Sequence, residues 1–340
     1  PDAPLAGKLD VALGSDAYRK LHAVIGGRSD SSGALAEVFH YGADGFKDLN
    51  SGQDTGFEKT DAMVKLDTYL GDKQQHHLEF KAKYSDETSN ETYLGLVDAD
   101  YAADAYQRYS ASQLDVMNTE HTHVSLHYDY IISPKSDVSI IAYNNDFARN
   151  WYKTSKVGGL SLGSGAEEIA AQIDNGTYSD TALPEVQIKA NNRSYTSQGI
   201  QGELAYRTGE HDIRFGLRLH EDDMDRYQWV DKYDLGTDQT LALTSAGIPG
   251  TDSNRIDSAS ATSLFIHDTW ELANLTLKGG LRYEDVELTR HDWGTADPQR
   301  AEVPAFRSNS VAALLPALGM TYQFNDDWVV LAGVQRSFAP

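Results

Sequence analysis

The sequence predicts an all-β protein, folded as an antiparallel barrel of the kind that spans a membrane with strands. Three observations predict it: segments with strict alternation of apolar and polar residues, short turn-forming sequences within pairs of such segments, and long polar stretches between the pairs. Alternation with a period of two is typical of strands with one apolar face. Short turns at one end and long loops at the other are typical of membrane-spanning barrels.

The first strands are expected near the amino end. We expect three strands there, at Lys8–Gly14, Tyr18–Gly27 and Ala34–Tyr41. A longer pair follows at Met63–Leu70 and Gln75–Tyr84, separated by four residues that include a glycine and an aspartate. Residues of these types favour hairpin turns, so we expect an antiparallel pair.

The middle of the chain carries the longest segments, His121–Ile132 and Val138–Trp151. In the first of them Val124, Leu126 and Tyr128 alternate with polar neighbours. Both are near or above the roughly 9–11 residues that a tilted strand needs to cross a bilayer. The same alternation recurs later in the chain, at Ile213–Leu219 and Leu275–Tyr283, and a last strand is expected at Trp328–Phe338.

The connections between these segments alternate in length. The short ones are Gly71–Gln74, Ser133–Asp137, Thr208–His211, Ala273–Asn274 and Asn325–Asp327, and the long polar ones are Glu87–Met117, Thr154–Asn192, Val230–Asp257 and Gly294–Asn309. So many long loops are unusual in a compact soluble domain. In a membrane barrel they are expected, with periplasmic turns short and extracellular loops long. We expect about thirteen strands in all.

Composition narrows the functional class. The chain of 340 residues has no cysteine, which excludes disulfides and cysteine metal sites. Its net charge of −22 argues against a nucleic-acid partner, which needs a basic face. Mean hydropathy is −0.50, and no run approaches the roughly 18 apolar residues of a membrane helix. Alternating barrel strands keep a low mean hydropathy and are compatible with these values.

Several long stretches resemble one known family. "LLPALGMTYQFNDDWVVLAGVQRSFAP" at Leu314–Pro340 and "FIHDTWELANLTLKGGLRYEDVELTR" at Phe265–Arg290 are similar to the middle of the barrel of TonB-dependent outer-membrane receptors. "GKLDVALGSDAYRKLHAVIGG" and "ALAEVFHYGADGFKDL" resemble the first barrel strands of that family. The stretches Glu91–Tyr109 and Tyr143–Lys153 resemble the ferric-citrate (iron dicitrate) receptor group.

The resemblance implies a barrel of about 22 strands and an amino-terminal plug domain. Residues 1–340 would then be the N-terminal part of the barrel domain, without the plug and without some later strands. The implied function is uptake of ferric chelates, siderophores or iron citrate, across the outer membrane of a Gram-negative bacterium, energised through TonB. Expected partners are the chelate, outer-membrane lipid, and TonB through the plug segment. A soluble secreted adhesin or carbohydrate-binding β-sandwich is the alternative, and a passive porin a third possibility.

Three motifs point to other chemistry but are better explained otherwise. Gly159–Gly163 matches the G-x-S-x-G pattern of a hydrolase, followed by a segment that could be a helix, but it lies in a loop between antiparallel pairs. Asp98, Asp100 and Asp104 lack the glycine and glutamate of a calcium loop. His121 and His123 share a strand face that is polar throughout. We therefore expect no catalytic residue, no metal ligands and no cofactor.

Basic and aromatic residues gather where strands are expected to leave the bilayer. In a chain this acidic, arginine at the mouth of a barrel favours binding of an anionic ligand, because its fork of donors matches carboxylates. Ferric citrate and many ferric siderophores are anionic. The candidate ligand-binding residues are Arg149, Trp151, Tyr152, Lys153, Arg193 and Arg226. The alternative is that these side chains only pack against loops or extend toward the membrane surface.

Overall fold

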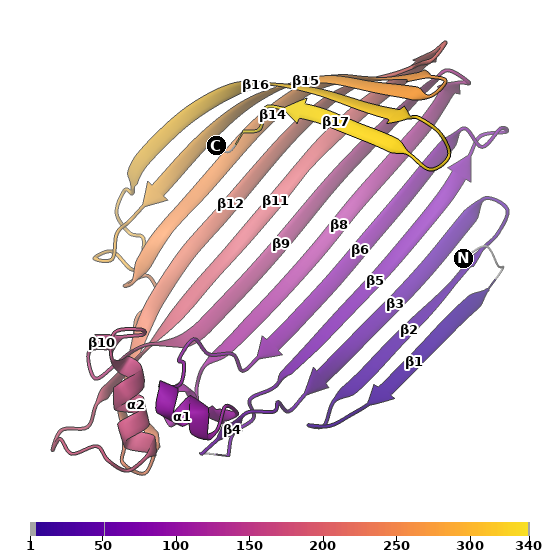
Figure 1. Ribbon diagram of the computed structural model, residues 1–340. Coiled ribbons are helices and arrows are strands. Elements are labelled where there is room, and N and C mark those ends of the chain that lie inside the picture. Colours follow the sequence, from indigo (N-terminus) through magenta and orange to yellow (C-terminus); the bar gives the residue numbers. More distant parts are fainter. Residues whose placement is uncertain (1–4, 51, 339–340) are drawn as a thin grey trace.

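The computed structural model describes residues 5–50 and 52–338, and Figure 1 shows one strongly curved sheet of long strands. Thirteen strands pair side by side in a single path that runs from β1 to β17. Each pairs antiparallel with its neighbour, as the alternating segments predict. The predicted fold class is confirmed, and the path holds the predicted thirteen strands, with four further short strands outside it.

The strands of this path differ widely in length. They are β1 (Ala6–Leu13), β2 (Arg19–Arg28), β3 (Ser32–Ala43), β5 (Phe57–Leu70), β6 (His76–Ser89), β8 (Val116–Ser133), β9 (Ser136–Val157), β11 (Glu185–Thr208), β12 (His211–Leu235), β14 (Ser253–Leu272), β15 (Leu275–Asp292), β16 (Ala305–Gln323) and β17 (Val329–Gln335). Four short strands lie off the path: β4 (Asp48–Leu49), β7 (Gln107–Arg108), β10 (Leu160–Ser161) and β13 (Leu241–Ser245). Two α-helices, α1 (Asp98–Ala103) and α2 (Ala166–Asp174), and a 3₁₀ turn at Ser110–Ser112 lie in the loops.

Short and long connections alternate from β2 onward. Residues 134–135, 209–210 and 273–274 turn the chain at one end of the sheet. Residues 90–115, 158–184 and 236–252 connect strands at the other end, where α1 and α2 lie (Figure 1). The connection between β1 and β2 is the exception, because it is short although it lies at the long-loop end.

The two faces of the sheet differ in polarity. Leu66, Phe80 and Leu126 are in register on neighbouring strands, and all three are exposed. Phe215 and Leu217 continue this apolar face further along the sheet. Residues in direct register share a face, so the alternating pattern places one apolar band on the outside of the curved sheet.

The opposite, inner face is polar. Lys81 and Ser125 are in register there, one residue away from the apolar positions. Ion pairs join neighbouring strands on this face, such as Lys65 with Glu79 at 2.6 Å and Arg214 with Glu203 at 2.8 Å. In a barrel that crosses a membrane, these side chains line the interior.

The strands extend further than the sequence pattern predicts. β9 continues to Val157 and β11 begins at Glu185, so the predicted loop Thr154–Asn192 shrinks to residues 158–184. β12 likewise continues to Leu235, well past the start of the predicted loop at Val230. Beyond the bilayer neither face has to be apolar, so the backbone pairing continues while the alternation disappears.

The long loops pack together around a small core of their own, which we call the loop core. Its buried members include Leu94, Tyr109 and Ile173 from the loops, and Val186 and Leu235 from strand ends. It gathers at the end of the sheet where α1, α2 and β10 lie (Figure 1). The predicted helical segment after Gly163 forms α2 and supplies buried alanines to it.

Buried polar groups hold the loop core together. Asp115 accepts hydrogen bonds from the backbone N–H and the hydroxyl of Thr154, at 2.7 and 2.8 Å, and from the Thr92 hydroxyl at 2.6 Å. Burial raises the pKa of Asp115 to about 6, against the opposing effect of these donors. Asp174 accepts from the Ser110 backbone N–H at 2.9 Å and so ties α2 to the loop before β8.

Among the described residues, no helix is both long enough and apolar enough to cross a membrane.

Candidate ligand-binding site

Four arginines form a row across four neighbouring strands. Arg149 of β9 pairs in register with Arg193 of β11, which pairs with Arg226 of β12. Arg226 pairs in turn with Arg255 of β14. Residues in direct register point to the same side of a sheet, and these four alternate with the apolar positions, so they share the inner face. We call Arg149, Arg193, Arg226 and Arg255 the arginine row.

The sequence predicted three of its members and missed the fourth. Arg149, Arg193 and Arg226 were identified by their places near strand exits, whereas Arg255 lies within the predicted loop Val230–Asp257. The structure shows that β14 begins at Ser253, so Arg255 is a strand residue with a fixed neighbour.

The two halves of the row differ in their counter-ions. Within residues 5–50 and 52–338, neither Arg149 nor Arg193 pairs with a carboxylate. Arg193 donates to the Asn191 side-chain oxygen at 3.0 Å and, more weakly, to the Tyr195 hydroxyl at 3.5 Å. Arg255 pairs with Asp257 at 3.1 Å, and Arg226 lies 3.9 Å from the same carboxylate. The Arg149 half therefore has the uncompensated positive charge.

Trp151 and Lys153 lie beside Arg149 on the same face. The Lys153 ammonium lies 3.6 Å from the Tyr93 ring centre and 4.7 Å from that of Trp151, and the two rings are 4.3 Å apart. Such cation–π contacts hold the ammonium without neutralising it. Lys189 is in register with Lys153 and adds a further basic side chain, paired with Asp252 at 2.6 Å.

Tyr152 lies on the other face of the sheet. Strand alternation turns it away from Arg149, and its hydroxyl bonds to the Asp231 carboxylate and the Tyr233 hydroxyl, both at 2.7 Å. Its ring packs against the loop core. The structure therefore does not bring Tyr152 together with Arg149 and Lys153, because a contiguous run in a strand divides between two faces.

Two buried donors on the inner face have no hydrogen-bond partner within the part of the chain that the structure describes. They are Nε1 of Trp151 and Nε of Arg226. Buried donors are normally satisfied, and an unsatisfied one costs about 1–3 kcal/mol. An anion bound beside the arginine row would supply acceptors within reach of such groups.

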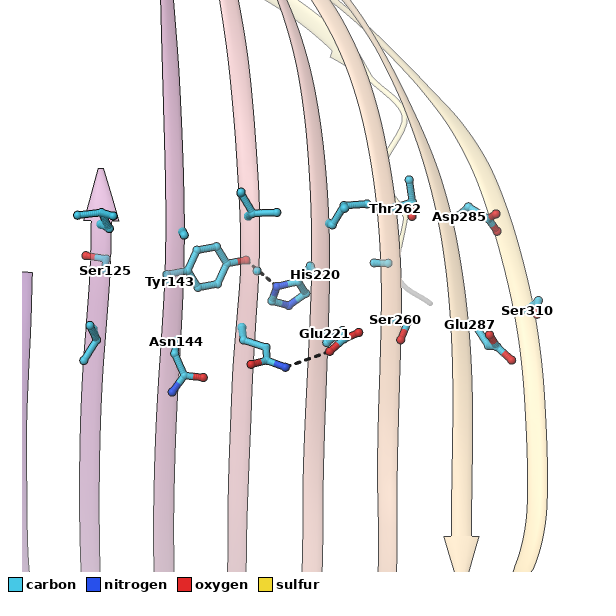
Figure 2. Close-up of a pocket in the computed structure, with 18 residues that line it drawn as sticks. Ser125, Tyr143, Asn144, His220, Glu221, Ser260, Thr262, Asp285, Glu287 and Ser310 are labelled. Carbon is cyan, nitrogen blue, oxygen red and sulfur yellow. Dashed lines mark hydrogen bonds between the residues drawn. The ribbon is translucent and has the colours of Figure 1, made fainter. Parts of the chain in front are cut away.

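A second polar cluster lies on the inner face, nearer the short-turn end of the strands than the arginine row. Figure 2 shows the Tyr143 side chain pointing toward His220, and its hydroxyl lies 2.6 Å from the His220 Nδ1. Arg218 donates to the same hydroxyl at 2.7 Å, and His220 Nε2 lies 2.8 Å from Asp222. An open hollow of about 840 Å³ includes Tyr143 and His220. Its lining also takes in Asn144, on the opposite face of the same strand, so it is not an enclosed chamber.

The other motifs have structural surroundings of their own. Ser161 lies in β10, which pairs with β9, and the glycines of its motif at 159 and 163 have positive φ, as in a tight turn. Asp100 accepts a hydrogen bond from the Tyr109 hydroxyl at 2.7 Å within the loop core. His123 bonds to Asn145 at 2.7 Å and to Ser125 at 3.1 Å. In the described ranges, no three residues of the kinds that ligate metals gather into a group that could hold an ion.

The chain matches a known family. Residues 65–340 match the model described as TonB dependent receptor-like, beta-barrel. A comparison with curated proteins finds no match.

Several solved structures are similar to this chain. The ferric citrate transporter FecA in its unliganded form aligns with a TM-score of 0.65 and 17% identity, over 98% of this chain and 45% of its own. The ferric-catecholate import receptor Fiu from E. coli K12, in its open form, gives 0.70 and 12%, over 100% and 55%. The ferric yersiniabactin uptake receptor FyuA from Yersinia pestis gives 0.66 and 14%, over 98% and 46%.

These similarities establish the fold alone, because the identities are low. The chain spans about half the length of the structures it matches, from 45% of one to 55% of another.

Proposed function

Because the chain belongs to the TonB dependent receptor-like β-barrel family, we propose that it forms part of an outer-membrane receptor that imports an anionic ferric chelate. Members of this family are transport receptors of the Gram-negative outer membrane rather than enzymes. The chelate would bind at the arginine row, and uptake would be energised through TonB acting on a plug domain. Ferric citrate, or another chelate rich in carboxylates, is the ligand class that this site fits best.

One observation carries the proposal: four arginines are in register on the inner face of a chain with a net charge of −22. In a chain with this excess of acidic residues, four neighbouring arginines on the inner face are not expected from composition alone. Two of the four, Arg149 and Arg193, have no carboxylate partner among the described residues. An arginine fork binds a carboxylate with two parallel hydrogen bonds, which favours a chelate with free carboxylates.

The position of the row on the strand is consistent with capture from outside. Arg149 lies thirteen residues beyond Ser136, where β9 leaves its short turn. That is about 43 Å of strand at roughly 3.3 Å per residue, or about 30 Å in height at a tilt near 45°. A hydrocarbon core is about 30 Å thick, so the row would lie at its outer boundary.

We also propose that residues 1–340 form the N-terminal part of a larger closed barrel that holds the plug. The paired path in the described residues is open, with β1 and β17 as its two edge strands. Long unpaired edges favour further pairing, and closure of a barrel removes them. The similar structures are about twice as long as this chain.

The rival, a soluble adhesin or carbohydrate-binding sandwich, is not favoured. A sandwich buries its apolar faces against each other. Here Leu126, Leu217 and Leu264 on one continuous face are 45%, 44% and 51% exposed. Such a face needs lipid or another apolar partner.

The test compares two variants of the complete receptor that carries this chain. Arg149→Gln removes one fork of the row, and Arg207→Gln is the matched control, because Arg207 lies at the short-turn end and pairs with Asp137. Isothermal titration would use ferric citrate, an anionic ferric catecholate and a neutral ferric hydroxamate.

Loss of a charge-assisted hydrogen bond costs about 1.5–3 kcal/mol of binding free energy. Arg149→Gln should therefore weaken binding of an anionic chelate by roughly ten- to a hundredfold. Arg207→Gln should bind as the wild type does. Unchanged affinity of Arg149→Gln for both anionic chelates would contradict the proposed function.

A further inference from the structure

The Asp257 carboxylate lies beside the arginine row and pairs with its members. Asp257 lies on the inner face of β14, two residues beyond Arg255. Its carboxylate pairs with Arg255 at 3.1 Å, with Arg290 of β15 by a short contact, and with Arg226 at 3.9 Å. Three guanidinium groups from three adjacent strands therefore converge on one carboxylate.

The pairing register of the strands fixes the position of this carboxylate. Asp257 is in direct register with Arg290, and the pairing of Arg226 with Arg255 fixes the third partner. The side chain of Asp257 is 20% exposed, and those of Arg226 and Arg255 are 26% and 25% exposed. The group thus faces the interior while solvent still reaches it, as a ligand would.

A fixed carboxylate beside a binding site for anions repels every negative charge on the ligand. The repulsions between the carboxylate and each negative charge of the ligand add together. The total cost in binding free energy therefore grows with the ligand's charge. β14 lies two strands from β11, or roughly 10 Å at about 4.8 Å per strand, which is comparable with the Debye length at about 0.1 M salt, so the repulsion is strongest at low salt. The same carboxylate also competes with the ligand for Arg226 and Arg255.

We propose that Asp257 is an internal counter-ion that sets the ligand charge the site accepts, by lowering affinity for each additional negative charge. The inference rests on the proposed function, since it concerns the same site. In the wild type, a chelate carboxylate binds at the uncompensated pair, Arg149 and Arg193. The Asp257 half holds its arginines in place and resists a second carboxylate, which keeps a highly charged ligand releasable.

The test uses the complete receptor and ligands of graded charge. Asp257→Asn removes the counter-ion, and Asp257→Glu keeps the charge. Asp223→Asn is the matched control, because Asp223 lies on the neighbouring strand and on the opposite face, bonded to Ser258. Isothermal titration with neutral, monoanionic and trianionic ferric chelates gives the dissociation constants at two salt concentrations.

Asp257→Asn should bind more tightly by about two- to tenfold for each negative charge on the chelate, and by less at high salt. The neutral chelate should show no gain. Asp257→Glu and Asp223→Asn should behave as the wild type does. A residue that only supported the sheet would not produce a gain that scales with ligand charge.

Weaker or unchanged binding of the trianionic chelate by Asp257→Asn would overturn the proposal, and Asp257 would then be a positioning residue for its arginines. If removal of the carboxylate prevents folding, Asp257→Asn with Arg290→Gln restores the local charge and should return affinity to the wild-type value. Failure of the proposed function itself is distinguishable, because Arg149→Gln would then bind anionic chelates normally.

Discussion

Replacement of Leu126 by arginine tests whether the apolar face meets lipid. Leu126 lies seven residues before Ser133, where β8 reaches its short turn. That is about 23 Å of strand, or about 16 Å in height at a tilt near 45°, close to the middle of a hydrocarbon core of about 30 Å. The side chain is 45% exposed on the apolar face, beside Phe80.

An arginine at the bilayer midplane costs about 2–4 kcal/mol in a membrane barrel, so Leu126→Arg should lower the free energy of unfolding by that amount. The matched control is His127→Arg, one residue away on the inner face. His127 lies 3.1 Å from the Asp129 carboxylate and is in register with Glu79, so an arginine there gains counter-ions. Its cost should stay below about 1 kcal/mol.

Ser125 is a poorer control, since it is buried against His123 and a large side chain would clash there. The assay is urea-dependent folding of the complete receptor into lipid vesicles, followed by tryptophan fluorescence. Equal costs for Leu126→Arg and His127→Arg would refute the assignment of the two faces.

Two further outcomes are expected. Burial raises the pKa of Asp115 to about 6 from 3.8, so the folded loop core holds that proton more tightly than the unfolded chain does. Between about pH 4 and pH 6 the loop core should therefore lose stability as pH rises, by up to about 3 kcal/mol. Asp115→Asn should abolish this pH dependence. The hydrogen-exchange protection factor of the Thr154 amide, measured across this pH range, reports the stability of the loop core. At Gly216 a Cβ atom would lie 1.9 Å from the Phe265 ring, which covers the glycine. Gly216→Ala should cost about 1–3 kcal/mol in urea unfolding, and the cost should shrink in a Phe265→Leu background; an equal cost in both would contradict a clash with the ring.

The register across each tight turn could be predicted from the sequence by counting. From the turn at Thr208–His211, Arg193 and Arg226 are equally distant and must face each other. From the turn at Ala273–Asn274, Asp257 and Arg290 are likewise paired. A two-residue turn fixes the register of the strands that it joins. These two residue pairs of the site can therefore be predicted from the sequence.

Pairs across the long loops could not be predicted in this way. Arg149 and Arg193 are separated by residues 158–184, and Arg226 and Arg255 by residues 236–252. A long loop does not fix register, and the polar outer parts of β9 and β11 have no alternation to replace it. Arg255 has a further reason, because the start of β14 carries no regular alternation and falls within the predicted loop Val230–Asp257.

Tyr152 is a different case. Its even position, in a strand whose inner face is odd-numbered, separates it from Arg149 and Lys153, and this separation follows from the sequence alone. Alternation still applies there, since the pairing of Arg149 with Arg193 and of Tyr152 with Ala190 continues unbroken. The loop core was unpredictable for a further reason: it gathers residues from separate loops, whose contacts depend on how the strands arrange them.

The strands extend well beyond the arginine row and form a rim above it. β11 continues for eight residues beyond Arg193, to Glu185, about 26 Å of strand or about 19 Å in height. Under the proposed function, a molecule much larger than a chelate would meet this rim and the loop core before it could reach the arginines. The residues of the rim could then change without a change in the residues proposed to contact the small ligand.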